Sequence, residues 1–171
     1  MKSIKFFFFI VLVFPYVSFG VCNDEKGDNE YEVYQVALKW KEAILKKNII
    51  VIASFALPED RETTINELRN KKSFLHGLFF DSEMMKKRGG KSVHSILNAS
   101  DHLKTVIVNH DIPEGHGNGV SVYYYDQDVV KLEFPIDPSK EQSLLDKGSI
   151  WKTFFFKVDD CWYTSYVYGD E

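Results

Sequence analysis

The chain has 171 residues, with 21 Lys and Arg against 25 Asp and Glu, and a formal net charge of −4. A chain of this length can bury one sizeable core, so we expect a single domain over residues 31–171. The basic residues occur in short, separated clusters and form no stripe, which argues against a nucleic-acid partner.

The first 20 residues have the three parts of a secretory signal peptide. Lys2 and Lys5 form a basic start, an apolar run covers residues 6–14, and Ser18 and Gly20 define a small-x-small cleavage site. The run is about half of the roughly 20 residues that a membrane-spanning helix needs, and no later segment is long enough, so we expect no membrane span. Cleavage after Gly20 would leave 19 basic against 25 acidic residues, a charge of −6. We expect an exported protein, periplasmic or extracellular.

Two cysteines, Cys22 and Cys161, follow the predicted cleavage site. In an oxidising compartment an even pair favours a disulfide, here across 138 intervening residues. One alternative is a buried, unpaired Cys161 with Cys22 in a mobile tail. Another is lipidation of Cys22 as in a bacterial lipoprotein, which the bulky Val21 disfavours. Residues 23–30 are polar, so we expect 21–30 to form a flexible segment.

Hydrophobic periodicity predicts helices in the first half of the chain. From Val33 to Ile44, apolar residues recur at three- and four-residue spacing, which predicts an amphipathic helix ending near Lys47. Asn48 can end this helix and serve as the N-cap of a short second helix over residues 49–56.

A weaker pattern predicts one longer third helix after Pro58. Its end is marked by residues 81–82 or, at the latest, by Gly89 and Gly90. The residues that we expect to face the core from this helix are Ile65, Leu68, Leu75 and Phe79. Residues 92–99 could form one more short helix.

From Leu103 onward, β-branched and aromatic runs alternate with turn residues, which predicts strands. The expected strands are 103–110, 120–125, 129–134, 150–158 and 161–168. The expected turns are 111–119, 126–128, 135–148 and 159–160. Short connections make consecutive strands antiparallel neighbours. We therefore expect an α+β fold, with N-terminal helices packed on a curved antiparallel sheet of four to six strands.

The two ends of the expected domain share features with a known superfamily. The first helix contains Trp40 and leads through residues 43–48, AILKKN, into 52–55, IASF, and the last strands contain 151–155, WKTFF, and 160–163, DCWY. In these features the chain resembles the cone-shaped nuclear-transport-factor-like domains, also called ketosteroid-isomerase-like. The resemblance implies a cone-like sheet and a homodimer. It implies no single activity, because members include both enzymes and binding domains.

The loop over residues 109–119 holds the densest group of polar residues. The metal ligands that it offers are His110, Asp111, Glu114 and His116. These groups could bind a divalent ion or act as acids and bases near neutral pH. A metal site would need a third ligand such as His102 or His94. However, the spacing matches no typical zinc motif, and a long hairpin turn needs the same Gly, Pro, Asn and Asp residues.

Tyr123, Tyr125 and Asp126 are the candidate ligand-binding residues of the strands. Tyr123 and Tyr125 share one face of a strand, and Tyr124 lies on the other. A ketosteroid-isomerase-like pocket needs a carboxylate as proton carrier and a tyrosine or protonated acid as oxyanion donor. Nothing in the sequence places these tyrosines opposite a carboxylate, and cross-strand packing explains them as well.

Motifs of phosphate loops, nucleophile elbows, zinc proteases and CxxC redox sites are absent from the sequence. The sequence therefore favours a non-catalytic exported domain that binds a protein or a small ligand through the sheet, without a cofactor. A ketosteroid-isomerase-like pocket enzyme or ligand binder is the first alternative, and metal binding through His110 and His116 is the second. Asn98-Ala99-Ser100 is an N-glycosylation sequon, relevant only in a eukaryotic host.

Overall fold

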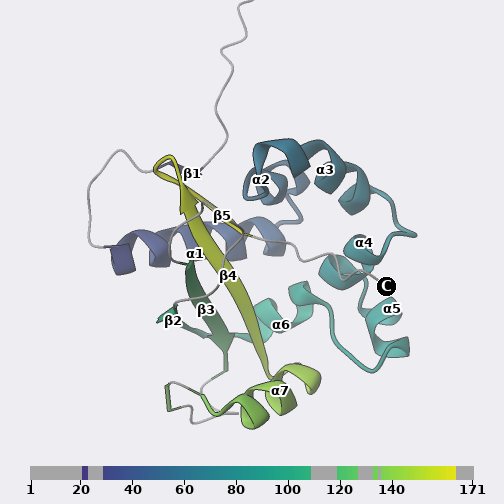
Figure 1. Cartoon of the computed structure of the whole chain (residues 1–171). Coiled ribbons are helices and arrows are strands. Elements are labelled where there is room, and N and C mark those ends of the chain that lie inside the picture. Colours follow the sequence, from purple (N-terminus) through teal and green to yellow (C-terminus); the bar gives the residue numbers. More distant parts are fainter. Residues whose placement is uncertain (1–20, 23–28, 109–118, 127–132, 135, 165–171) are drawn as a thin grey trace, which may run out of the picture.

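The fold consists of a helical half followed by an antiparallel sheet (Figure 1). The computed structural model describes residues 21–22, 29–108, 119–126, 133–134 and 136–164. Its helices are α1 (Asn29–Leu45), α2 (Ile49–Ser54), the 3-10 helix η1 (Pro58–Asp60), α3 (Arg61–Arg69), α4 (Phe74–Phe80), α5 (Ser82–Lys87), α6 (Val93–Ala99) and α7 (Pro138–Asp146). Its strands are β1 (Val21–Cys22), β2 (His102–Val108), β3 (Gly119–Tyr125), β4 (Ile150–Val158) and β5 (Cys161–Thr164). The predicted α+β class is confirmed.

The described strands form one antiparallel sheet in the order β1-β5-β4-β3-β2. Its register places Tyr124 of β3 between Leu103 of β2 and Trp151 of β4. The hairpin between β4 and β5 turns at Asp159 and Asp160, as predicted. Both residues have positive φ, 47° and 60°, as a two-residue turn between twisted strands requires.

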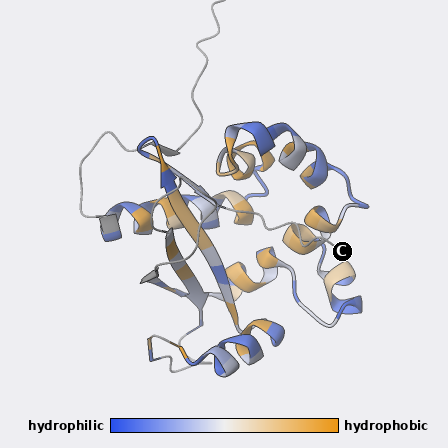
Figure 2. Cartoon of the chain, in the orientation of Figure 1, coloured by the Kyte–Doolittle hydropathy of each residue, from blue (hydrophilic) through white to orange (hydrophobic). Residues whose placement is uncertain are grey.

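One face of the sheet packs against α1 and α6 through an aromatic core. The Trp40 ring lies 6.2 Å from Phe79, 5.6 Å from Tyr124 and 6.2 Å from Phe155. The Tyr124 hydroxyl donates to the backbone carbonyl of Ala37 at 3.1 Å. The predicted inward stripe of α1 is confirmed, since every member is at most 4% exposed: Val33, Val36, Ala37, Trp40, Ala43 and Ile44. Hydrophobic residues also dominate α4, α6 and β4, whereas α3 is largely hydrophilic (Figure 2).

The junction between α1 and α2 follows the prediction. Lys47, with a φ of 52°, lets the chain leave α1. The Asn48 side chain then caps α2 by accepting from the backbone N–H of Val51. Beyond α2, the carbonyl of Phe55 accepts from the backbone N–H of Thr164 at 2.8 Å, which joins the helical half to β5.

The prediction of one long third helix is wrong, because two capping residues divide the segment into α3, α4 and α5. The Ser73 hydroxyl accepts from the backbone N–H of His76 and starts α4. Asp81 accepts from two backbone N–H groups and starts α5. Each cap satisfies N–H groups that a continuous helix would have bonded internally. Of the residues expected to face the core, Leu68, Leu75 and Phe79 are buried and Ile65 is half-buried.

The segment 135–148, predicted to be a turn, contains α7. Asp137 caps this helix by accepting from the backbone N–H groups of Ser139 and Lys140. Pro138 occupies the first turn, where the missing N–H of proline costs no helical hydrogen bond. Gly148, with a φ of 61°, follows its end. The strand expected at 129–134 lies mostly outside the described residues, and residues 133–134 are not in a strand.

The N-terminal segment contains regular structure that the sequence did not predict. Residues expected to belong to a flexible stretch form β1 and the first residues of α1. In the pairing of β1 with β5, Cys22 lies opposite Cys161. Cys161 is disulfide-bonded, and Cys22 is the only other cysteine of the sequence. Within the described ranges, no helix is long and apolar enough to cross a membrane.

Candidate functional site

The predicted ligand-binding tyrosines lie on the sheet face that points away from α1. Tyr123 and Tyr125 share this face, as expected, and both rings pack against Phe134, at 5.3 and 6.0 Å. Tyr124 points the other way, into the aromatic core. Asp126 is half-buried and directly follows β3.

Tyr123 belongs to a cluster that sequence reasoning missed. Its hydroxyl donates to Glu141 of α7 at 2.7 Å, and Lys152 of β4 donates to the other oxygen of that carboxylate at 2.8 Å. The Lys152 ammonium also lies 5.3 Å from the centre of the Tyr123 ring. We call Tyr123, Glu141 and Lys152 the α7 clamp. The sequence pattern predicts a turn over residues 135–148, and a turn does not place Glu141 opposite a tyrosine.

The α7 clamp keeps its tyrosine protonated and its lysine charged. Burial and then the hydrogen bond to Glu141 raise the pKa of Tyr123. Burial opposes the charge of Lys152, but its bonds to Glu141 and Tyr123 outweigh that effect and raise its pKa. Both pKa values lie above those of the unfolded chain, about 10 for these residues. The stabilisation is therefore fully present below about pH 10 and is lost as the pH rises through the folded-state values. Because the Tyr123 hydroxyl already donates a hydrogen bond to Glu141, the clamp is better suited to holding α7 on the sheet than to acid–base catalysis.

A second buried carboxylate joins α1 to the last hairpin. Glu32 is 3% exposed, and it accepts from the Lys157 ammonium at 3.1 Å and from the Trp162 indole at 3.4 Å. Lys157 also lies 3.6 Å from Asp160. These partners come from the ends of β4 and β5, so the group fixes the hairpin against the helix. The Glu32 carboxylate is thus engaged in packing, as is common for a charge held in the interior.

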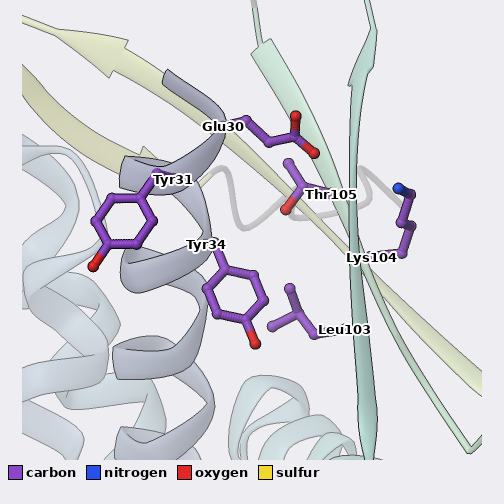
Figure 3. A pocket seen from close by; sticks show the side chains of 6 residues that line it. All are labelled: Glu30, Tyr31, Tyr34, Leu103, Lys104 and Thr105. Carbon is purple, nitrogen blue, oxygen red and sulfur yellow. The ribbon is translucent and has the colours of Figure 1, made fainter. Parts of the chain in front are cut away.

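An open groove lies between the first turns of α1 and strand β2 (Figure 3). Its volume is about 390 Å³, and its lining residues are Glu30, Tyr31, Tyr34, Leu103, Lys104 and Thr105. The Tyr34 ring points toward Leu103, while Lys104 leaves β2 on the opposite side of the strand. Tyr31 and Tyr34 are 63% and 40% exposed, which is unusual for aromatic residues of a packed helix.

The sequence of α1 contains a signal for this groove. Tyr31 and Tyr34 fall outside the inward stripe that begins at Val33 and Val36, so helical periodicity alone exposes two aromatic side chains. Exposed aromatic residues on an otherwise amphipathic helix are typical of contact surfaces.

Thr105 gives the groove an unsatisfied polar group. This residue is only 7% exposed, and its hydroxyl has no hydrogen-bond partner among the described residues. An unpaired buried hydroxyl costs about 1–3 kcal/mol, so such groups are rare unless something else binds them. Among the described strands, β2 is an edge strand of the sheet. On the outer side of an edge strand, alternate backbone N–H and C=O groups point away from the sheet. The groove therefore offers aromatic surface and a sheet edge, and the unpaired hydroxyl of Thr105 is buried in its wall.

The metal ligands predicted in the loop, His110, Asp111, Glu114 and His116, lie outside the described residues. Both suggested third ligands are described. His102 packs its ring 5.8 Å from that of Tyr125, and His94 is half-buried on α6. Within the described part of the chain, no three His, Cys, Asp or Glu residues are grouped so that they could hold a metal ion.

No protein-family model, curated protein or solved structure matches the chain. The function therefore has to be inferred from the chemistry of the groove and of the two buried carboxylate clusters.

Proposed function

We propose that the chain is exported and acts as a non-catalytic binding module, which takes an extended peptide segment of a protein partner in the groove between α1 and β2. The observation that carries this proposal is the buried hydroxyl of Thr105, which lines an open groove and has no partner among the described residues.

Two features support export. The first 20 residues have the basic start, the apolar run and the small-x-small site of a signal peptide. Cys161 is disulfide-bonded, and disulfides persist mainly in oxidising compartments. We assign its partner as Cys22, which pairs with it in the register of β1 and β5.

The form of the groove supports an extended peptide as its occupant. A peptide strand added beside β2 would pair with the outward backbone groups of that strand, a recurring mode of peptide recognition. Leu103 and Tyr34 would contact an apolar side chain. Thr105 would turn its buried hydroxyl toward the groove and bond to a polar side chain or to the peptide backbone. Tyrosine suits this task because its rigid ring gives large contact area at low entropic cost.

The hydrogen bonds that the carboxylates of Glu32 and Glu141 make within the chain favour a binding role over a catalytic one. Glu141 bonds to Tyr123 and Lys152, and Glu32 bonds to Lys157 and Trp162. A catalytic carboxylate needs an oxygen within reach of a substrate proton, and neither of these acids lines the groove. The groove itself holds Glu30 and Lys104 but no paired nucleophile and base.

Site-specific photo-crosslinking in the producing cells tests the proposal. A photo-reactive phenylalanine analogue replaces Tyr34 in one variant and Phe74 in a matched control, since these side chains are 40% and 49% exposed. We expect one polypeptide to be linked at position 34 and not at position 74, with the linked residues confined to one short segment. Adding Thr105→Val to the first variant should reduce that product. Equal yields at both positions, or links scattered over unrelated segments, would contradict the proposal.

A further inference from the structure

We infer that Asn98 is an N-glycosylation site, which receives an oligosaccharide when the chain passes through a eukaryotic secretory route. Asn98-Ala99-Ser100 is the one Asn-x-Ser/Thr sequence in the 171 residues, and its middle residue is not proline. The inference rests on the export part of the proposed function, and it is independent of what the groove binds.

Helix α6 presents the acceptor residue to solvent. Its inward face carries Val93, Ile96 and Leu97, which are at most 5% exposed, whereas Asn98 and Ala99 are exposed. A bulky polar group on the Asn98 amide would therefore project outward, and the core contacts of α6 would remain intact.

The serine of the sequon is inaccessible in the folded chain. Ser100 is 4% exposed, and its hydroxyl donates to the carbonyl of Ile96 at 2.6 Å. The Ser100 carbonyl also accepts a hydrogen bond from the Lys41 ammonium of α1. A transferase that reads Asn, the following residue and the Ser hydroxyl together needs all three in an accessible chain. The structure thus points to transfer before α6 packs against α1, while the chain is still entering the secretory compartment.

The proposed transfer uses an oligosaccharide carried on a lipid diphosphate. The amide nitrogen of Asn98 forms a bond to C1 of the first sugar, and the bond between C1 and the diphosphate oxygen breaks. The lipid diphosphate leaves with the electron pair of that bond, and the amide nitrogen loses one proton. No oxidation or reduction takes place.

The full chain with its own leader can be produced in eukaryotic secretory cells and analysed by mass after denaturation. We expect the wild type to carry one glycan that peptide-N-glycosidase removes. Asn98→Gln and Ser100→Ala should lack it, and Ser100→Thr, which keeps the hydroxyl, should retain it. Asn66→Gln is the matched control, because Asn66 is an exposed helical asparagine outside any sequon, and it should retain the glycan. Since the readout is the mass of the denatured chain, it does not depend on whether a variant folds.

A second set of chains with a foreign signal peptide separates this inference from the export proposal. Secretion without a glycan, under either leader, would overturn the inference. A chain that stays unglycosylated inside the cell with its own leader, yet is secreted and glycosylated with the foreign one, would support the inference and contradict export by residues 1–20.

Discussion

Replacing Thr105 by valine should make the free chain more stable and its binding weaker. The two side chains have nearly the same shape and the same branching at Cβ. Thr105 is 7% exposed and its hydroxyl has no partner among the described residues, so the native chain bears a desolvation cost of about 1–3 kcal/mol. Valine removes this cost and adds a buried methyl group. We expect the free energy of unfolding to rise by about 1 kcal/mol, and the peptide that the groove binds to lose affinity.

Urea unfolding of the oxidised mature chain measures the free energy of unfolding. Titration with a synthetic peptide of the cross-linked segment measures the binding affinity. The matched control is Thr64→Val. Thr64 is 1% exposed on α3, and its hydroxyl likewise has no partner within the described part of the chain, but it does not line the groove. This control should raise stability in the same way and leave affinity unchanged.

Two outcomes would refute the reasoning. A fall in the stability of Thr105→Val would mean that the hydroxyl is hydrogen-bonded in the free chain. Unchanged peptide affinity, with higher stability, would mean that the groove does not use this hydroxyl for binding.

Three further predictions concern stability. Cys161→Ser should lower the free energy of unfolding by about 5 kcal/mol, because the bond assigned to Cys22 closes a loop of 138 residues, and reductant should give the same loss in the wild type during urea unfolding. Glu141→Gln should cost about 1–3 kcal/mol at neutral pH. It should also remove the part of the stability loss above about pH 10 that comes from Lys152, whereas the part caused by the burial of Tyr123 should remain, as followed by unfolding at several pH values. Gly119→Ala should cost about 1–3 kcal/mol, because a Cβ there would lie 1.7 Å from the Phe154 ring and would force it aside; thermal unfolding measures this shift.

The spacing of apolar residues is sufficient to predict those elements in which the apolar residues also face the core. The stripe of α1, the cap at Asn48 and the bounds of β4 follow from residue spacing and capping chemistry. The predicted helix end at residues 81–82 matches the end of α4 at Phe80. The break before α4 and the start of α5 do not follow from apolar spacing, since they depend on Ser73 and Asp81 as N-caps. The resemblance to nuclear-transport-factor-like domains stays a prediction.

The candidate sites depend on contacts between residues far apart in the chain. The sequence singled out Tyr123, but its partner Glu141 lies on a helix that was predicted to be a turn. The groove brings residues near position 31 beside residues near position 104, and no local pattern encodes that proximity. The sequence does show that Tyr31 and Tyr34 lie outside the apolar stripe of α1, so only these two lining residues could have been singled out.

Amide hydrogen exchange along β2 tests the central claim most directly, since strand addition must protect backbone groups at the edge of the sheet. The mature chain would be compared alone and with the synthetic segment identified by cross-linking at position 34. We expect slower exchange at alternate residues of His102–Val108, where outward N–H groups gain partners, and little change on α7. Unchanged exchange along β2 with a bound peptide, or protection confined to another surface, would contradict binding in this groove.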